Sequence, residues 1–165
     1  MADVHNAKQR SRNMAAIKGK DSKPEMIVRR LLHGFGFRYS LHKKMLPGRP
    51  DLVFTARKKI IFVHGCYWHM HNCRWGSVVP ATRTGFWQAK RSSNVRRDQT
   101  NHEALVSLGW DVLVVWECET RNLDTLESRL VAFLAGRQSK RRVDRPSSPA
   151  RAAAKLGTSS SHDGR

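Results

Sequence analysis

The fold of this chain is decided by residues 50–64, which read PDLVFTARKKIIFVH. The stretch holds two short apolar runs rich in Val, Ile and Phe, as expected of strands. Arg57-Lys58-Lys59 between them has the charge of an exposed turn, so we predict a hairpin formed by Asp51–Phe54 and Ile60–Val63. Pro50-Asp51 places a carboxylate at the start of the first strand.

The segment before the hairpin predicts a helix and then a β-type run. Ser22 can cap the helix, Pro24 is tolerated in its first turn, and Glu25 completes a capping box. Four apolar side chains then share one face at helical spacing: Ile27, Val28, Leu31 and Leu32. Gly34 suits the C-terminal stop of this helix, and Phe35–Leu41 is the β-type run that follows.

The segment after the hairpin predicts a loop, a helix and a strand. The loop, His64–Pro80, is rich in Cys, His and aromatic residues. Thr84 can cap a helix at Gly85–Leu108, which Gly109 ends. Trp110–Trp116 is almost continuously apolar, as expected of a strand covered on both faces.

A last helix is predicted at Leu123–Leu134, before a tail with little to bury. The order of elements, a helix, several strands and then helix–strand–helix, predicts a single α/β domain around a mixed sheet. We place this domain at residues 21–136, between a basic N-terminal segment at 1–20 and a basic tail at 137–165.

The charge of the chain points to a polyanionic partner. The 165 residues carry a formal net charge of +18. The apolar runs are much shorter than the roughly 18 residues of a membrane span, so we expect no membrane association. Three cysteines and an N-terminus without the apolar core of a secretory signal favour the reducing cytoplasm, where nucleic acid is the usual partner of so basic a protein.

The tail at residues 137–165 carries eight Lys or Arg residues against Asp144 and Asp163, and so +6 of the total +18. Its Ser, Ala and Pro content predicts disorder. Two interpretations stay open at equal weight, an ordinary solvated terminus and an arm that binds phosphates without sequence preference.

Cysteines and histidines in the loop predict a structural zinc site. Cys66 and Cys73 lie close together, and Cys118 follows the last predicted strand. Thiolates and imidazoles are the ligands of structural zinc, and a metal would give shape to a loop with little core of its own. His69 and His71 both qualify as the fourth ligand, and spacing alone does not choose between them. The alternative is a buried Cys118 thiol and exposed loop histidines.

Asp51 is the first candidate for a catalytic metal ligand. A carboxylate at a strand end, with groups from the neighbouring strand, suits Mg²⁺, which prefers oxygen and keeps several waters. Restriction endonucleases continue this pattern with an acid, any residue and Lys. Here the second half reads Phe62-Val63-His64, so the acid is missing and His64 stands where Lys is expected.

Several motifs give this departure a meaning. They are LPGRPD at residues 46–51, FVHGCYWH at 62–69, PATRTGFW at 80–87 and VVWEC at 114–118. Together with the opening residues 1–14, they resemble the very short patch repair endonucleases, in which Phe-x-His replaces the acid-x-Lys half. The resemblance spans roughly residues 1–135. It implies a restriction-endonuclease-like mixed β-sheet flanked by helices, with a zinc-stabilised loop.

The resemblance also implies a catalytic role for five residues. Asp51 would hold Mg²⁺, with the backbone carbonyl of Val63 as a second ligand. His69 would act as general base on the attacking water, and His64 would assist at the scissile phosphate. Glu25 would orient the hydrated metal, unless it is only the capping-box acid.

The structural zinc would be held by four residues that the resemblance selects: Cys66, His71, Cys73 and Cys118. Members of this family act at T:G mismatches in DNA, and aromatic side chains intercalate beside the mismatched pair. Their positions here are Tyr67, Trp68 and Trp87. Aromatic wedges probe weakly stacked base steps, and a T:G pair is such a step. We expect Phe86 to pack in the core instead, and Lys and Arg residues within 8–30 to contact phosphates.

The function that follows is an endonuclease that nicks one DNA strand 5′ of the T in a T:G mismatch. We expect a monomer, with mismatched double-stranded DNA as its substrate and mismatch-repair proteins as candidate partners. Two alternatives remain, a related nuclease retargeted to other DNA, as in defence, and a zinc-stabilised DNA-binding protein in which Asp51 is only structural.

Overall fold

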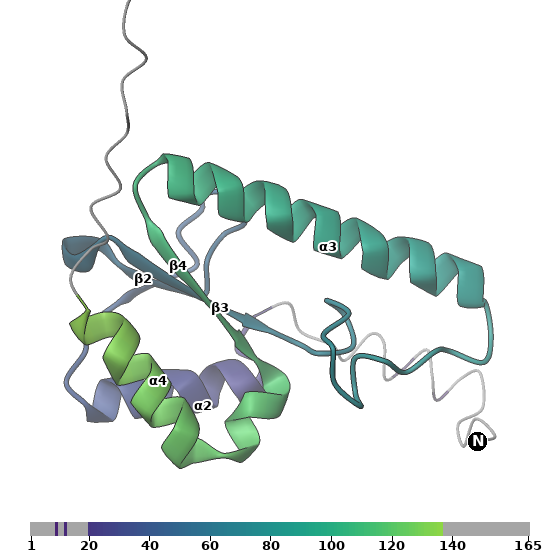
Figure 1. The fold of residues 1–165 in the computed structure, drawn as a ribbon, viewed down its shortest axis with the longest axis horizontal. Coiled ribbons are helices and arrows are strands. Elements are labelled where there is room, and N and C mark those ends of the chain that lie inside the picture. The colour runs from purple at the N-terminus through teal and green to yellow at the C-terminus, as the bar shows by residue number, and fades with distance from the viewer. Residues whose placement is uncertain (1–8, 10–11, 13–19, 137–165) are drawn as a thin grey trace, which may run out of the picture.

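The computed structural model describes residues 9, 12 and 20–136 of the chain. The predicted tail at 137–165 and most of the basic segment at 1–20 lie outside the described residues. The remainder forms a four-stranded mixed sheet with helices on both faces, as the order of elements predicted (Figure 1).

The sheet has the order β1-β2-β3-β4, from β1 (Ser40–Leu41) through β2 (Leu52–Phe54) and β3 (Lys59–His64) to β4 (Asp111–Trp116). The pairs β1–β2 and β2–β3 are antiparallel, and β3–β4 is parallel. In the parallel pair, Lys59 lies opposite Asp111 and His64 opposite Trp116. The chain segments that follow β3 and β4 therefore leave the sheet at the same edge.

Helices α2 (Lys23–Gly34) and α4 (Leu123–Ala135) cover one face of the sheet, and α3 (Thr84–Ser107) covers the other (Figure 1). Strand residues alternate between the two cores, as the two-residue period of a strand requires. The α2–α4 side buries nine residues: Val28, Leu32, Leu52, Phe54, Ile61, Val115, Leu126, Leu130 and Leu134. The α3 side buries four: Val53, Ile60, Leu105 and Trp110.

Helix α3 is much longer than the strands beneath it. Its 24 residues span about 36 Å, whereas the six residues of β3 or β4 span about 20 Å. Leu105, near the C-terminal end of the helix, packs on the sheet, whereas the buried residue of its N-terminal half is Arg91. The N-terminal half therefore extends past the sheet and covers the loop that follows β3 (Figure 1).

The first helix starts as predicted and ends later than predicted. The hydroxyl of Ser22 accepts a hydrogen bond from the backbone N–H of Glu25, at 3.4 Å. The left-handed residue that closes the helix is Gly36, at φ +80°, whereas Gly34 is still helical. The predicted β-type run Phe35–Leu41 shortens to β1, because this stop occupies its first residues.

Two other local predictions need correction. The residues between β2 and β3 form a 3₁₀ turn, Thr55–Arg57, and Lys58 adopts the left-handed conformation at φ 52°, while Lys59 already belongs to β3. Thr84 does not cap α3, because it is the first helical residue and its hydroxyl donates to the carbonyl of Pro80.

Within the described residues, the helices lack the combination of length and apolar character needed to cross a membrane.

Candidate active site and metal-binding cluster

Asp51 lies directly before β2 and reaches the end of β3. Its Oδ2 accepts a hydrogen bond of 2.7 Å from the backbone N–H of Val63. In an extended strand the N–H and C=O of one residue point to the same side, so the Val63 carbonyl is also directed toward this carboxylate. Two oxygen donors from neighbouring strands therefore converge here, which is the donor chemistry that Mg²⁺ prefers.

The pKa of Asp51 is well above its ordinary value. Burial raises the pKa from 3.8 to about 6; the N–H of Val63 acts against this, and so do His42 and His69, while the nearby Glu25 carboxylate adds to the rise. Burial and a neighbouring carboxylate both disfavour the ionised form of this group. A bound cation would stabilise that form.

Glu25 faces this site from the first turn of α2. It is only 2% exposed, and its Oε1 lies 3.2 Å from Nε2 of His42 and 3.5 Å from Arg29. The His42 ring also approaches Asp51, with Nδ1 3.8 Å from Oδ1. His42 thus bridges the two carboxylates at ion-pair distance, although its buried Nε2 lacks hydrogen-bond geometry to any described group.

His64 and His69 form a stacked pair beside Asp51. Their ring centroids are 3.9 Å apart and the planes differ by 11°. Burial lowers the pKa of His64 to about 4, and His69 adds to this, so His64 is neutral at physiological pH. Nδ1 of His69 is hydrogen-bonded to the Asp98 carboxylate on α3. That bond fixes the ring and leaves Nε2 for a substrate, as in an oriented general base.

Two hollows meet at these residues. An open groove of about 1320 Å³ is lined by Asp51, Val63, His64, His69 and Asp98, with basic side chains at Lys20, Lys44, Arg49 and Arg97. A second hollow of about 610 Å³ shares Asp51, Val63 and His69 and adds Glu25, Trp68 and Trp87. Asp51, Val63 and His69 therefore lie between a basic groove and a pair of indole rings.

The aromatic residues predicted to intercalate form one contact chain. The rings of Tyr67 and Trp68 meet edge to face at 5.1 Å, and Trp68 meets Trp87 in the same way at 5.9 Å. All three are half-buried. The prediction for Phe86 is wrong: this side chain is 49% exposed and lies on Arg83 at the start of α3, because that end of the helix projects beyond the sheet.

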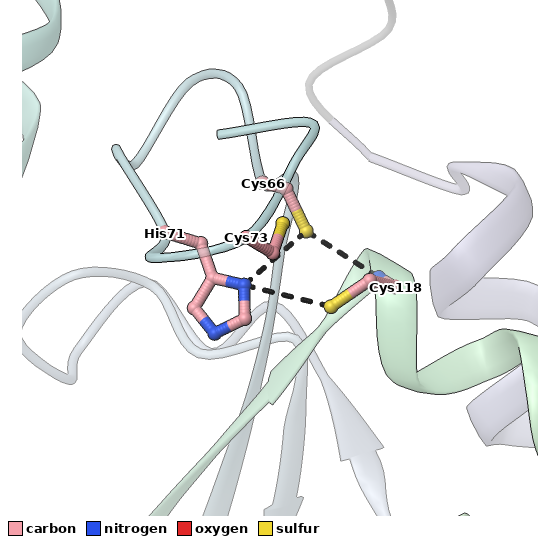
Figure 2. Close-up of side chains that lie close together, drawn as sticks. All are labelled: Cys66, His71, Cys73 and Cys118. Atoms are coloured by element: carbon pink, nitrogen blue, oxygen red, sulfur yellow. Dashed lines mark hydrogen bonds between the residues drawn. The ribbon is translucent and has the colours of Figure 1, made fainter. Parts of the chain in front are cut away.

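The four predicted zinc ligands come together beyond the ends of β3 and β4 (Figure 2). Their donor atoms all lie within 4.8 Å of one another. Nδ1 of His71 is 3.5 Å from Sγ of Cys118 and 3.7 Å from Sγ of Cys66, and the backbone N–H of Cys118 points at Sγ of Cys66. Three sulfurs and one imidazole at such separations fit a tetrahedral metal such as zinc.

The surroundings of this cluster also suit a metal. Burial opposes ionisation of Cys73, yet the N–H groups of Gly76 and Trp75 and the His71 ring outweigh it and lower the Cys73 pKa to about 6. The indole of Trp116 stacks on the His71 ring, with centroids 4.2 Å apart. The cluster could therefore hold a structural metal. His69 lies with His64 and Asp98 instead, so the geometry selects His71 as the fourth donor.

Comparison with known proteins gives the family. The chain is 45% identical over 130 residues to the type II nicking enzyme V.XorIIP of Xanthomonas oryzae pv. oryzae, an alignment that covers 79% of this chain and 95% of that protein. It is 42% identical over 149 residues to the DNA mismatch endonuclease Vsr of Escherichia coli K12, with 87% and 95% covered. The model of the family DNA mismatch endonuclease Vsr matches residues 2–75. The chain belongs to the Vsr family.

Further Vsr-family relatives are named nicking enzymes. V.NmeAIP of Neisseria meningitidis serogroup A is 40% identical over 130 residues, covering 79% of this chain and 92% of the relative. The resemblance noted from the sequence motifs is therefore confirmed, and the four-stranded mixed sheet is the fold of a Vsr-family DNA nicking endonuclease. The family match at residues 2–75 includes Asp51, His64 and His69, whereas Cys118 lies outside it.

Sequence reasoning missed three residues of this Vsr-family site: His42, Asp98 and Arg91. His42 follows β1 in the left-handed conformation at φ 46°, and no motif marks it. Asp98 and Arg91 belong to a mostly polar helix without a distinct apolar face, so neither residue stands out. A single acid within the basic run RRDQ was the one available signal for Asp98.

Proposed function

We propose that this chain nicks one strand of double-stranded DNA 5′ of the T in a T:G mismatch, in a reaction that requires Mg²⁺. The observation that carries the proposal is the shared lining of the two hollows. Asp51, Val63 and His69 line both, and the second also contains Trp68 and Trp87. A phosphate held at Asp51 would therefore be next to a base step in contact with the indoles.

The oxygen donors of Asp51 and Val63 would hold the metal, with Glu25 orienting its waters. When bound, Mg²⁺ would neutralise the phosphate and lower the pKa of the attacking water. His69 accepts the proton of that water, because Asp98 fixes the ring with Nε2 available. The water oxygen bonds to phosphorus as the phosphorus–oxygen bond to the leaving strand breaks. His64, stacked on His69, lies beside the phosphate as a neutral hydrogen-bonding group.

The proposed reading of the mismatch rests on the Tyr67–Trp68–Trp87 chain of rings. A wobble pair stacks less well than a matched pair, so separating it from its neighbour costs less than the few kcal/mol of an ordinary step. The rings project beside the reactive groups and can insert at such a weak step. Zinc at Cys66, His71, Cys73 and Cys118 would keep the loop that carries two of these rings in shape.

A nicking assay on defined duplexes tests the proposal and separates its alternatives. The substrates are one labelled sequence with T:G, T:A, C:G and A:C at a single position, with and without added Mg²⁺. Cutting only of T:G, and only with Mg²⁺, is expected. Equal cutting of matched duplexes would indicate a nuclease retargeted to other DNA, and zinc-loaded protein that binds without cutting would indicate a DNA-binding protein.

Asp51→Asn provides the matched control, because the amide keeps the size and the hydrogen bond to Val63 while removing the charge. This variant should bind the T:G duplex as the wild type does and leave it uncut. Nicking at an unchanged rate by Asp51→Asn would place the active site elsewhere.

A further inference from the structure

Arg91 is a charged residue buried between the N-terminal half of α3 and the loop that follows β3. Only 5% of the residue is exposed. Nε donates to the carbonyl of Tyr67 at 2.7 Å and one terminal nitrogen donates to the carbonyl of Val78 at 2.9 Å, while the other donates to the carbonyl of Gly76. Among the described residues, its hydrogen bonds go to backbone carbonyls rather than to a carboxylate.

These three carbonyls belong to both arms of the loop. Tyr67 directly follows the cluster residue Cys66, whereas Gly76 and Val78 follow Cys73. A guanidinium presents its donors in a fixed planar fork, so one side chain sets the spacing of the two arms. A lysine at this position would keep the charge but could not reproduce the fork.

Arg91 also contacts the Tyr67 side chain. Its guanidinium carbon lies 4.4 Å from the centre of the phenol ring. Both the backbone and the ring of Tyr67 are therefore held by one residue. Trp87 lies four positions before Arg91 and so on the same face of α3. The helix thus supplies the last ring of the aromatic chain together with the group that holds the first.

We propose that Arg91 is a positioning residue that holds Tyr67 and Trp68 in place for the mismatch-reading step. This inference rests on the proposed function. Rings that are ordered before binding lose less conformational entropy when they insert into DNA. This gain strengthens binding only to a duplex into which the rings insert, which is the T:G duplex. Arg91 should therefore affect discrimination between T:G and matched duplexes more than it affects general DNA affinity.

The test compares Arg91→Lys and Arg91→Met with Arg96→Met, which removes an exposed arginine from the same helix. Three quantities are measured on full-length zinc-loaded protein: zinc content, amide hydrogen exchange of residues 65–80, and nicking of T:G against T:A duplexes at low DNA concentration. In both Arg91 variants, exchange should accelerate and the T:G preference should fall by about tenfold, as for the loss of one hydrogen bond to a charged group. Arg96→Met should leave both unchanged.

Three results would overturn the role of Arg91. The first is unchanged exchange and preference in Arg91→Lys with zinc retained. The second is an equal loss on both duplexes, which would mean that Arg91 supports DNA binding in general. The third is faster exchange with an unchanged T:G preference, since Arg91 would then hold the loop for stability alone. A wild type without any T:G preference overturns the proposed function instead, and it does so independently of the exchange measurement.

Discussion

At the scale of single residues, Asp51 ties the stability of the chain to its chemistry. Its pKa is raised by burial from 3.8 to about 6, so the folded chain binds the proton more tightly than the unfolded chain. The free energy of unfolding therefore falls as pH rises from about 4 to 6 and stays lower above that. Protonation of Asp51 therefore stabilises the fold, whereas the proposed Mg²⁺ site would require the ionised carboxylate.

Asp51→Asn should remove this penalty. Without Mg²⁺ at pH 7.5, the variant is expected to be more stable than the wild type by about 2 kcal/mol, the size of a two-unit pKa change reduced for partial exposure. The difference should vanish near pH 4. Urea denaturation at both pH values measures it. Adding Mg²⁺ should stabilise the wild type and leave the variant unchanged; stabilisation of both would argue against Asp51 as a ligand.

His69→Ala and Asp98→Asn test the general base. His69→Ala should slow T:G nicking by about 10²-fold or more, the usual contribution of a positioned base, and higher pH should restore part of the rate through hydroxide. Asp98→Asn should lower the rate less, because it loosens the His69 ring without removing it. Single-turnover rates from pH 6 to 9 distinguish the two. A His69→Ala rate equal to that of the wild type would assign the base to another group.

Most of the residues predicted from the sequence lie inside contiguous motifs. Asp51, His64, His69, Cys66 and Cys118 do, and the structure brings Asp51 to the two histidines and Cys66 to Cys118. Asp98 was missed because its contact with His69 joins positions 29 apart through the docking of α3. His42 was missed because its role depends on a backbone turn that places it between Glu25 and Asp51.

At the scale of elements, we expect the loop after β3 to depend for its shape on a metal held by the Cys/His cluster. We predict one zinc per chain, which elemental analysis of protein purified without added metal would detect. Cys118→Ser should lose the zinc and aggregate, since a structural metal contributes directly to folding. Val79→Ser is the control, because Val79 lies in the same loop with 70% of its surface exposed, and this variant should keep the metal. Soluble, active protein without zinc would contradict the four-ligand site.

Helix α2 and the central strands were predicted from their apolar patterns, whereas their ends were not. The alternation in Leu52–Phe54 and Ile60–Ile61 already separates the two cores. Helix α2 ends later than predicted because Gly36 rather than Gly34 takes the left-handed position, and the sequence offers both glycines as helix stops. Helix α3 has little apolar periodicity, because its N-terminal half packs on a loop through Arg91.

At the scale of the whole molecule, the net charge of +18 extends beyond the described domain. Residues 137–165 hold +6 of it, so they should add affinity through phosphate neutralisation. Each phosphate contact contributes about 0.9 to the slope of log affinity against log salt. Truncation after Gly136 should flatten this slope and weaken binding to matched and mismatched duplexes alike. Binding measured at several salt concentrations tests this, and a selective loss of T:G preference would show that the tail reads DNA structure.

The parallel pairing of β3 with β4 has a consequence for the order in which the chain assembles. Lys59 and Asp111 are 52 positions apart, and so are Cys66 and Cys118. Contacts between such distant positions form late in folding, because the entropy of closing the long intervening segment is lost before the contacts contribute any stability. Cys66, His71 and Cys73 lie close enough along the chain to bind a metal ion early, whereas Cys118 would join them only when β4 docks. A complete set of four ligands would therefore report that the slowest pairing in the sheet has formed.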